Sequence, residues 1–325
     1  MGFKRLEPED FLVSADAVSA TVWTGNKPTL STFNYSTAQF GDRSGDYYLS
    51  VYQTTPSDSS AEVQFDIAFA DKTGRGSLAY NSSVSTQLSP SRTVYGQYRT
   101  LLLEDENADF KFGGVAQNYF YVITINRARY KEKLLPGSLG LDLSFSGNTL
   151  SLTDNSKDVT IPTYYGSSRA YEIVAGSNGS ATTGKGYAGA GGESTTIGSY
   201  GLFYPDAGVI ILNPRALSAS IHGEFSTADM HNSNQDDNNA KKLLDAISHT
   251  SRDGQNDGYF ICDSEEKITS QYYFTRVRNH EFNYTANPSF IDDSGTLRHN
   301  SMVDNPTVFI TSVGLYNDGG DLLAV

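Results

Sequence analysis

The sequence contains a single cysteine, Cys262, and a single tryptophan among its 325 residues. One cysteine cannot form a disulfide within the chain, and it excludes a cysteine-rich zinc site. It fits synthesis in a reducing compartment. No apolar run reaches about 18 residues, so no transmembrane helix is expected. The first residues, MGFKRLEPEDF, lack the apolar core of a signal peptide, and Leu6 stands where a myristoylation signal needs Ser or Thr.

Positive charge is also scarce. The 24 Lys and Arg residues against 37 Asp and Glu give a net charge of −13. Such a chain repels phosphate, so we expect no nucleic-acid partner. Hydrophobic content is only 38%, whereas 21 Tyr and 17 Phe raise the aromatic share to 12%. Tyr buries its ring and leaves its hydroxyl in water, which suits thin sheets and contact surfaces.

Period-two alternation is the strongest local pattern. It is clearest in AEVQFDIAFA, residues 61–70, where apolar side chains share one face of a strand and polar side chains the other. The apolar face consists of Val63, Phe65, Ile67 and Phe69. Residues 146–148 predict a hairpin, and residues 204–208 have the composition of a turn. Further strands are expected at 46–54, 98–104, 110–112, 119–130, 139–145, 148–153, 170–175, 200–204, 207–212, 258–262, 271–277 and 307–315.

These patterns predict a mainly β protein: antiparallel sandwich- or barrel-like domains with long loops and one or two short helices. A helix is expected near 237–248, where Leu243, Leu244 and Ile247 form an apolar stripe. The expected segments are an N-terminal arm or short helix at 1–20, a first β domain at 21–135, and a second β domain at 136–325. The second includes a long Gly/Ser-rich loop at 176–199.

No motif in the chain is a catalytic signature. The G-x-G-x-x-G at Gly184, Gly186 and Gly189 lacks a following helix and fits a flexible glycine loop. No two of the five histidines are three or four residues apart, so no helical metal pair arises. The acid pairs at 236–237 and 292–293 fit caps and turns, although a loop-bound calcium ion stays open. We therefore expect no enzymatic activity, no catalytic or metal-binding residues, and no cofactor.

The stretch YFYVITINRARYKEKLLPG, residues 119–137, starts apolar and ends basic. In one continuous strand, alternate residues would place four cations on the end of an apolar face. These are Arg127, Arg129, Lys131 and Lys133. Four buried cations need carboxylate partners, so this end is either a solvated strand end that protects an edge or an interface with an acidic partner. A second copy of this acidic chain qualifies as that partner. Arg276 and Arg278 repeat the alternation and join the same candidate interface.

Several stretches, in order, resemble one family over most of the chain. They are SATVWTGNKPTLSTF at 19–33, RARYKEKLLPGS at 127–138, LSLTDNS at 150–156, YGLFYPDAGVIILNPRAL at 200–217, YYFTRVRN at 272–279, HEFNYTANPSF at 280–290 and NPTVFITSVGLYNDGGDLLAV at 305–325. The set is similar to virion structural proteins of large T4-like tailed bacteriophages of marine bacteria and cyanobacteria. Its ending resembles a short β motif of tail-fibre and collar attachment domains.

The resemblance implies a non-enzymatic virion structural protein, located in the tail or baseplate or at a fibre attachment. It would assemble in the cytoplasm of the bacterial host, with copies of itself and other phage structural proteins as partners. Family members continue past the closing motif, so two alternatives are expected: the chain is truncated or processed, or its apolar end adds to a neighbour's sheet. That end supplies Leu322, Leu323 and Val325 to the candidate interface. A capsid-surface or neck component, and a carbohydrate-binding or glycan-cleaving β protein with weak glycan contact, remain alternatives.

Overall fold

The computed structural model forms two compact units, which we describe separately. The central unit comprises Asp16–Ile268, and the terminal unit comprises Met1–Ala15 together with Thr269–Val325. The residues that the structure describes are 4–25, 28, 34–36, 48–55, 57–73, 91–145, 148–182, 199–222, 236–248, 259–278 and 280–325. The expected glycine motif at 184–189 lies outside these residues, as do most of the expected loop at 176–199 and two histidines, His231 and His249.

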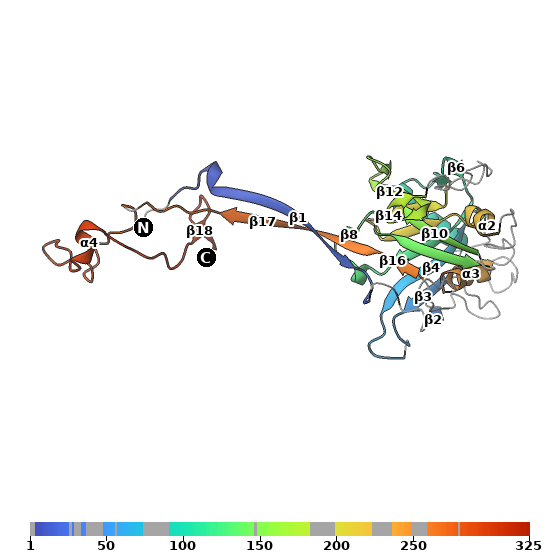
Figure 1. Cartoon of the computed structure of the whole chain (residues 1–325), viewed down its shortest axis with the longest axis horizontal. Helices are drawn as coiled ribbons and strands as arrows, with labels where there is room; N and C mark the ends of the chain where they lie inside the picture. The colour runs from blue at the N-terminus through green and yellow to red at the C-terminus, as the bar shows by residue number, and fades with distance from the viewer. Residues whose placement is uncertain are drawn as a thin grey trace. The chain divides into compact units, whose positions relative to one another are not determined.

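The central unit is built on one antiparallel sheet (Figure 1), in which twelve strands fall within the described residues. Its main path runs β16 (Tyr259–Ile261), β9 (Gly140–Phe145), β10 (Asn148–Asp154), β12 (Ser168–Ser177), β14 (Gly201–Tyr204), β15 (Val209–Leu212), β7 (Tyr119–Ile125), β4 (Val63–Asp71), β3 (Tyr48–Tyr52) and β2 (Asn34–Ser36). Two short strands, β11 (Thr163–Tyr165) and β13 (Ser180–Ala181), pair with β12. The sheet curls into a half-barrel. Strands account for 40% of the structure and helices for 17%, so the predicted fold class is confirmed.

Alternation in the sequence decides which face of the sheet each side chain meets. In β4, Phe65, Ile67 and Phe69 enter one apolar core, as predicted. β7 buries both of its faces, since Tyr121 joins that core and Phe120 joins a second core on the opposite side. A strand covered on both sides needs no polar face, which explains the unbroken YFYVITI run.

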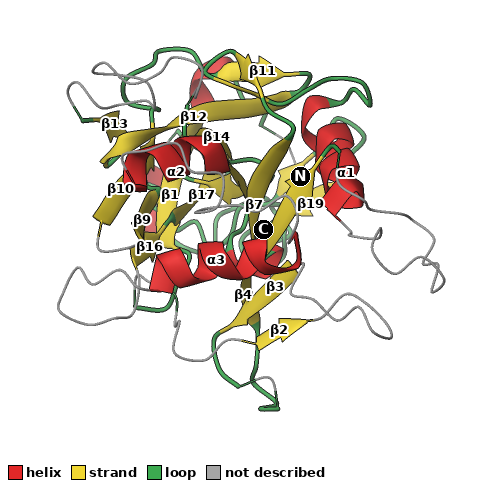
Figure 2. Cartoon of the chain, turned by 90° about the vertical axis from the view of Figure 1, so that its right-hand side faces the viewer, coloured by secondary structure: helices red, strands yellow, loops and turns green. Residues whose placement is uncertain are grey.

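Helices cover the two faces (Figure 2). α2 (Pro214–His222) and α3 (Asp236–Ser248) pack on the first core, and α1 (Ser91–Leu103) packs on the second. The predicted helix at 237–248 is confirmed as α3, with its leucines fully buried. The strand predicted at 98–104 is wrong. Tyr95, Tyr98 and Leu102 have helical spacing and put one side of α1 against the sheet.

Strand pairing confirms the predicted hairpin and shows that the predicted turn also closes a hairpin. β9 and β10 pair directly from Phe145↔Asn148 onward. β14 and β15 are joined at 205–208, where Gly208 has φ +68°. A Cβ at Gly208 would lie 2.3 Å from the Tyr130 hydroxyl, which donates to Ala207 O at 3.1 Å. This position therefore needs glycine both for its backbone conformation and for its space.

The remaining strands form small sheets. β1 (Phe11–Thr21), β17 (Asp263–Tyr273) and β8 (Lys133–Leu134) make a three-stranded sheet in that order. β5 (Lys111–Phe112) pairs with β6 (Val115–Ala116) in the central unit. In the terminal unit, β18 (Leu315–Tyr316) pairs with β19 (Leu322–Ala324). The same unit contains the short helices η1 (Pro8–Asp10) and α4 (Ser301–Asp304).

The structure corrects the predicted segments. Strands from both sides of residue 135 share one sheet, so the boundary at Pro136-Gly137 is wrong: β7 and β15 pair across it. The expected arm at 1–20 is η1 followed by β1. The strand expected at 271–277 lies earlier, as β17, and residues 306–314 belong to no strand. Sequence patterns locate apolar segments well, but strand pairing between distant segments decides which of them share a sheet.

Candidate assembly surface

The basic stretch after β7 is not one strand face. β7 ends at Ile125, and η2 (Arg127–Arg129) follows. Asn126 caps this short helix, because its Oδ1 accepts a hydrogen bond from Ala128 N at 3.0 Å. The helix breaks the alternation, so the predicted continuous strand over 119–130 and the shared direction of its cations are wrong. Asn is a preferred cap, and its place before Arg127 is the signal that the sequence offered.

Arg127 and Arg129 are engaged within the central unit. The Arg127 guanidinium lies 4.6 Å from the centre of the Tyr130 ring and donates to Tyr130 O. Arg129 Nη2 lies 2.7 Å from Gln53 Oε1 and 3.2 Å from Glu62 Oε2. The Arg129 side chain is only 12% exposed. Arg129 therefore links η2 to the segment between β3 and β4 through Gln53 and Glu62.

Lys131 and Lys133 pair with acidic residues at the start of β17. Lys131 Nζ lies 2.7 Å from Glu266 Oε2, and Lys133 Nζ lies 3.1 Å from Glu265 Oε2. The carboxylates that the charge argument required thus come from this same chain. The Lys131 side chain stays 75% exposed, so it is far more accessible to a partner than Arg129 or Lys133.

Arg276 and Arg278 belong to the terminal unit, whereas Arg127–Lys133 belong to the central unit. Both side chains are exposed. Their backbones are fixed locally: Arg276 O accepts from Lys4 Nζ, and Arg278 N donates to Glu281 Oε2 at 2.8 Å. Neither guanidinium forms an ion pair with any residue that the structure describes. Both guanidinium groups are therefore accessible to an acidic partner.

The closing apolar residues lie in a hairpin of their own chain. Leu315 pairs with Ala324 and Tyr316 with Leu322. Asn317 closes the turn, since its Oδ1 accepts from Asp321 N at 2.8 Å and its Nδ2 donates to Asp321 Oδ2 at 3.0 Å. Leu323 nevertheless remains 68% exposed and Val325 83% exposed. The hairpin satisfies the backbone of this end and leaves its apolar side chains uncovered.

Apolar exposure is the dominant property of the terminal unit. Every buried hydrophobic residue among those described lies between Val22 and Cys262, outside this unit. Its large apolar side chains instead face outward, with Phe309 at 88% exposure. The others that are most exposed are Phe11, Leu12, Val13, Tyr272, Tyr273, Phe274, Phe282, Tyr284, Val303, Val308, Ile310, Val313, Tyr316, Leu322, Leu323 and Val325. Contiguous exposed apolar patches mark sites of protein association, and the concentration of exposed apolar residues in this unit indicates such a site.

Local hydrogen bonds stabilise turns in the terminal unit. In one such turn, Asp292 Oδ1 accepts hydrogen bonds from Ser294 Oγ at 2.6 Å, Ser294 N at 3.0 Å and Thr296 N at 2.8 Å. The hydrogen bond from the Ser294 side chain lowers the pKa of Asp292 most. These three hydrogen bonds to Oδ1 agree with the predicted turn role of Asp292. Across the described residues, no group of three His, Cys, Asp or Glu side chains is placed to hold a metal ion.

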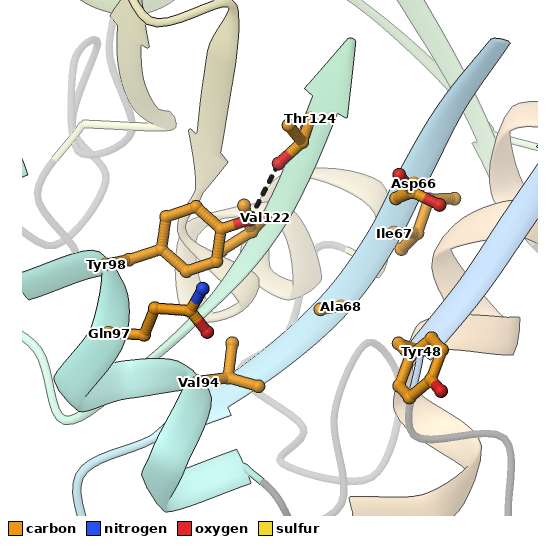
Figure 3. A pocket seen from close by; sticks show the side chains of 9 residues that line it. All are labelled: Tyr48, Asp66, Ile67, Ala68, Val94, Gln97, Tyr98, Val122 and Thr124. Atoms are coloured by element: carbon orange, nitrogen blue, oxygen red, sulfur yellow. Dashed lines mark hydrogen bonds between the residues drawn. The ribbon is translucent and has the colours of Figure 1, made fainter. Parts of the chain in front are cut away.

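The central unit has a hollow of about 200 Å³ between α1 and strands β3, β4 and β7 (Figure 3). Tyr98 points from α1 to Thr124 on β7, with 2.7 Å between their oxygens. Asp66 is the one carboxyl among the lining residues, and Ser50 donates to it at 2.5 Å. Burial raises the pKa of Asp66. The hollow therefore lacks the carboxylate pair that glycoside cleavage commonly uses.

Sequence reasoning missed the extent of the exposed surface. Phe11, Leu12, Val13, Phe282 and Tyr284 also lie exposed, and the predicted interface does not include them. Large apolar residues close together in otherwise polar stretches were the available signal. No helix in the described part of the chain is long and apolar enough to cross a membrane. Comparisons with models of known protein families, with curated proteins and with solved structures found no match.

Proposed function

We propose that this chain is a non-enzymatic virion structural protein of a tailed bacteriophage, a component of the tail or baseplate or of a fibre attachment. It acts by covering, and being covered by, other protein chains. The observation that carries this proposal is the terminal unit: its described residues include no buried apolar side chain, while more than a dozen large ones lie exposed.

The physical reason is the hydrophobic effect. Each large apolar side chain that leaves water contributes roughly 1.5–3 kcal/mol, so a defined segment with none buried has little driving force of its own. A partner chain that covers Phe309, Phe282 and Tyr284 would supply it. Fully buried cores of interfaces are rich in such aromatic residues. The position in the particle follows from the resemblance of the chain to phage structural proteins, and a capsid-surface or neck position is the alternative within the same class.

The test is association of the full chain, followed by its place in the particle. We expect sedimentation velocity of the purified chain to show a concentration-dependent oligomer, and mass spectrometry to find the chain in purified virions. A copy number of about 3 to 18 per particle indicates the tail, whereas hundreds indicate the shell. A chain that remains monomeric at high concentration and is absent from particles would refute the proposal.

A further inference from the structure

Residues 307–314, TVFITSVG, have the composition of a strand but belong to none. They combine β-branched and aromatic residues and carry no charge. Within the described chain, none of residues 308–313 makes a hydrogen bond. Val308, Phe309 and Ile310 are exposed as well. An uncharged segment of β-forming residues that belongs to no strand is suited to add to the edge of another sheet.

One sheet edge in the same unit is open to such a strand. β17 lies between β1 and β8, but β8 pairs with it only at Ser264 and Glu265. Beyond Glu265, no strand in the described chain lies on that side of β17. The open stretch continues through 269–274, where Tyr272, Tyr273 and Phe274 are exposed.

Parity shows which backbone groups face the open side. Cys262 O accepts from Val22 N, and Phe274 N donates to Asp10 O, so even-numbered positions of β17 turn toward β1. On the other side, Asp263 O accepts from Leu135 N and Lys267 N donates to Glu132 Oε2. Odd-numbered positions 269, 271 and 273 therefore direct their backbone groups to the side that lacks a strand.

Charge favours a second copy of this chain as the partner. Neither the open edge at 269–275 nor residues 307–314 contain a charge, so the two segments meet without repulsion. An antiparallel pair with Val308 opposite Phe274 brings Asp304, the last residue of α4, near Arg278, which follows the end of β17. Neither of these charged side chains has an ion-pair partner among the described residues. Tyr272 and Tyr273 then face Ile310 and Phe309, the aromatic and β-branched pairs that stabilise sheets.

We propose that residues 307–314 of one copy form an antiparallel strand on the open edge of β17, residues 269–274, of a second copy. This inference rests on the proposed function and names the partner of that surface. The donor and acceptor segments differ, so the contact is heterologous: its repetition builds a ring where the rotation between copies closes, and a filament where it does not.

Engineered cysteines test the pairing in the full chain. Phe274 would be a non-hydrogen-bonded partner of Val308, with Cα atoms about 4.5 Å apart, within the range of a disulfide. We expect a mixture of the F274C and V308C chains under mild oxidation to give linked dimers at least tenfold above a mixture of F274C and S312C. Position 312 lies four residues out of register, and the native Cys262 is buried.

A charge exchange supplies a second readout that does not depend on disulfide geometry. We expect R278D alone, or D304R alone, to weaken association about threefold to tenfold, and the double variant R278D/D304R to restore it. Sedimentation velocity at low salt measures the change. If the double variant associates no better than the single ones, the proposed register is wrong.

The outcomes separate this inference from the proposed function. Oligomers that form without the F274C–V308C link would overturn the strand pairing but leave the assembly role standing. Cross-linking of the two cysteines only within a double-mutant monomer would show that the strand pairs with its own chain, and would also overturn the inference. A chain that stays monomeric in every one of these experiments would refute both the strand pairing and the proposed function.

Discussion

Arg129 and Glu62 lie 3.2 Å apart, and Arg129 is nearly buried while Glu62 is not. Charge reversal by R129E would place a carboxylate beside Glu62 and remove the hydrogen bond to Gln53. We expect this to lower the free energy of unfolding by about 2 kcal/mol or more, because the introduced carboxylate occupies a poorly solvated position without a cationic partner. Urea unfolding followed by far-UV circular dichroism measures the loss.

The matched control for this pair is K131E. Lys131 is also paired, but its side chain is mostly in water. Exposed pairs contribute at most about 1 kcal/mol, so K131E should leave the unfolding midpoint almost unchanged. An equal loss of unfolding free energy in the two variants would contradict the stabilising contact assigned to Arg129.

Two phenylalanines should separate folding from association. Phe65 is fully buried, with its ring 5.8 Å from Trp23 and 5.2 Å from Phe260. F65A should destabilise the central unit by about 3–5 kcal/mol. F309A, at a fully outward position, should leave that stability unchanged and weaken association. Fluorescence of Trp23, the only tryptophan, reports unfolding of the central unit.

A pH effect should follow from Asp66. Burial raises its pKa in the folded state, so its stabilising contribution is complete below the unfolded pKa and is lost as pH rises through the folded pKa. We expect the wild-type chain to lose more stability between about pH 4 and pH 7 than D66N, which cannot titrate there. The Asn side chain keeps an oxygen for the Ser50 hydroxyl. Urea unfolding at the two pH values measures the difference, and identical slopes for both chains would contradict the assignment.

Removal of residues 322–325 should affect assembly and not the core. β19 pairs only with β18 in the described chain, and neither strand reaches the buried clusters of the central unit. The free energy of unfolding of the central unit, followed by Trp23 fluorescence, should change by less than about 0.5 kcal/mol. Incorporation into oligomers, measured by size-exclusion chromatography with light scattering, should fall. A large loss of central stability would show that the hairpin supports the core.

Local patterns predicted much of the central unit. Alternation at 61–70 located β4 and its buried face, and the stripe around Leu243 located α3. Turn residues at 204–208 located the hairpin between β14 and β15. In each case the signal lies within about ten residues, where side-chain period and backbone preference act directly. The α1 segment failed because its aromatic residues suit a strand as well as a helix, and packing on the sheet decided between them.

The sequence by itself determined that the chain is mainly β, acidic, and without a catalytic signature or a membrane-length apolar helix. Only the tertiary structure decided that the cations after β7 meet the chain's own carboxylates, and that one sheet joins strands from both predicted domains. It also decided that the apolar residues of the terminal unit remain in water. The reason is physical: the period of a segment tells which residues share a face, but burial and pairing depend on which distant segment comes to lie against that face.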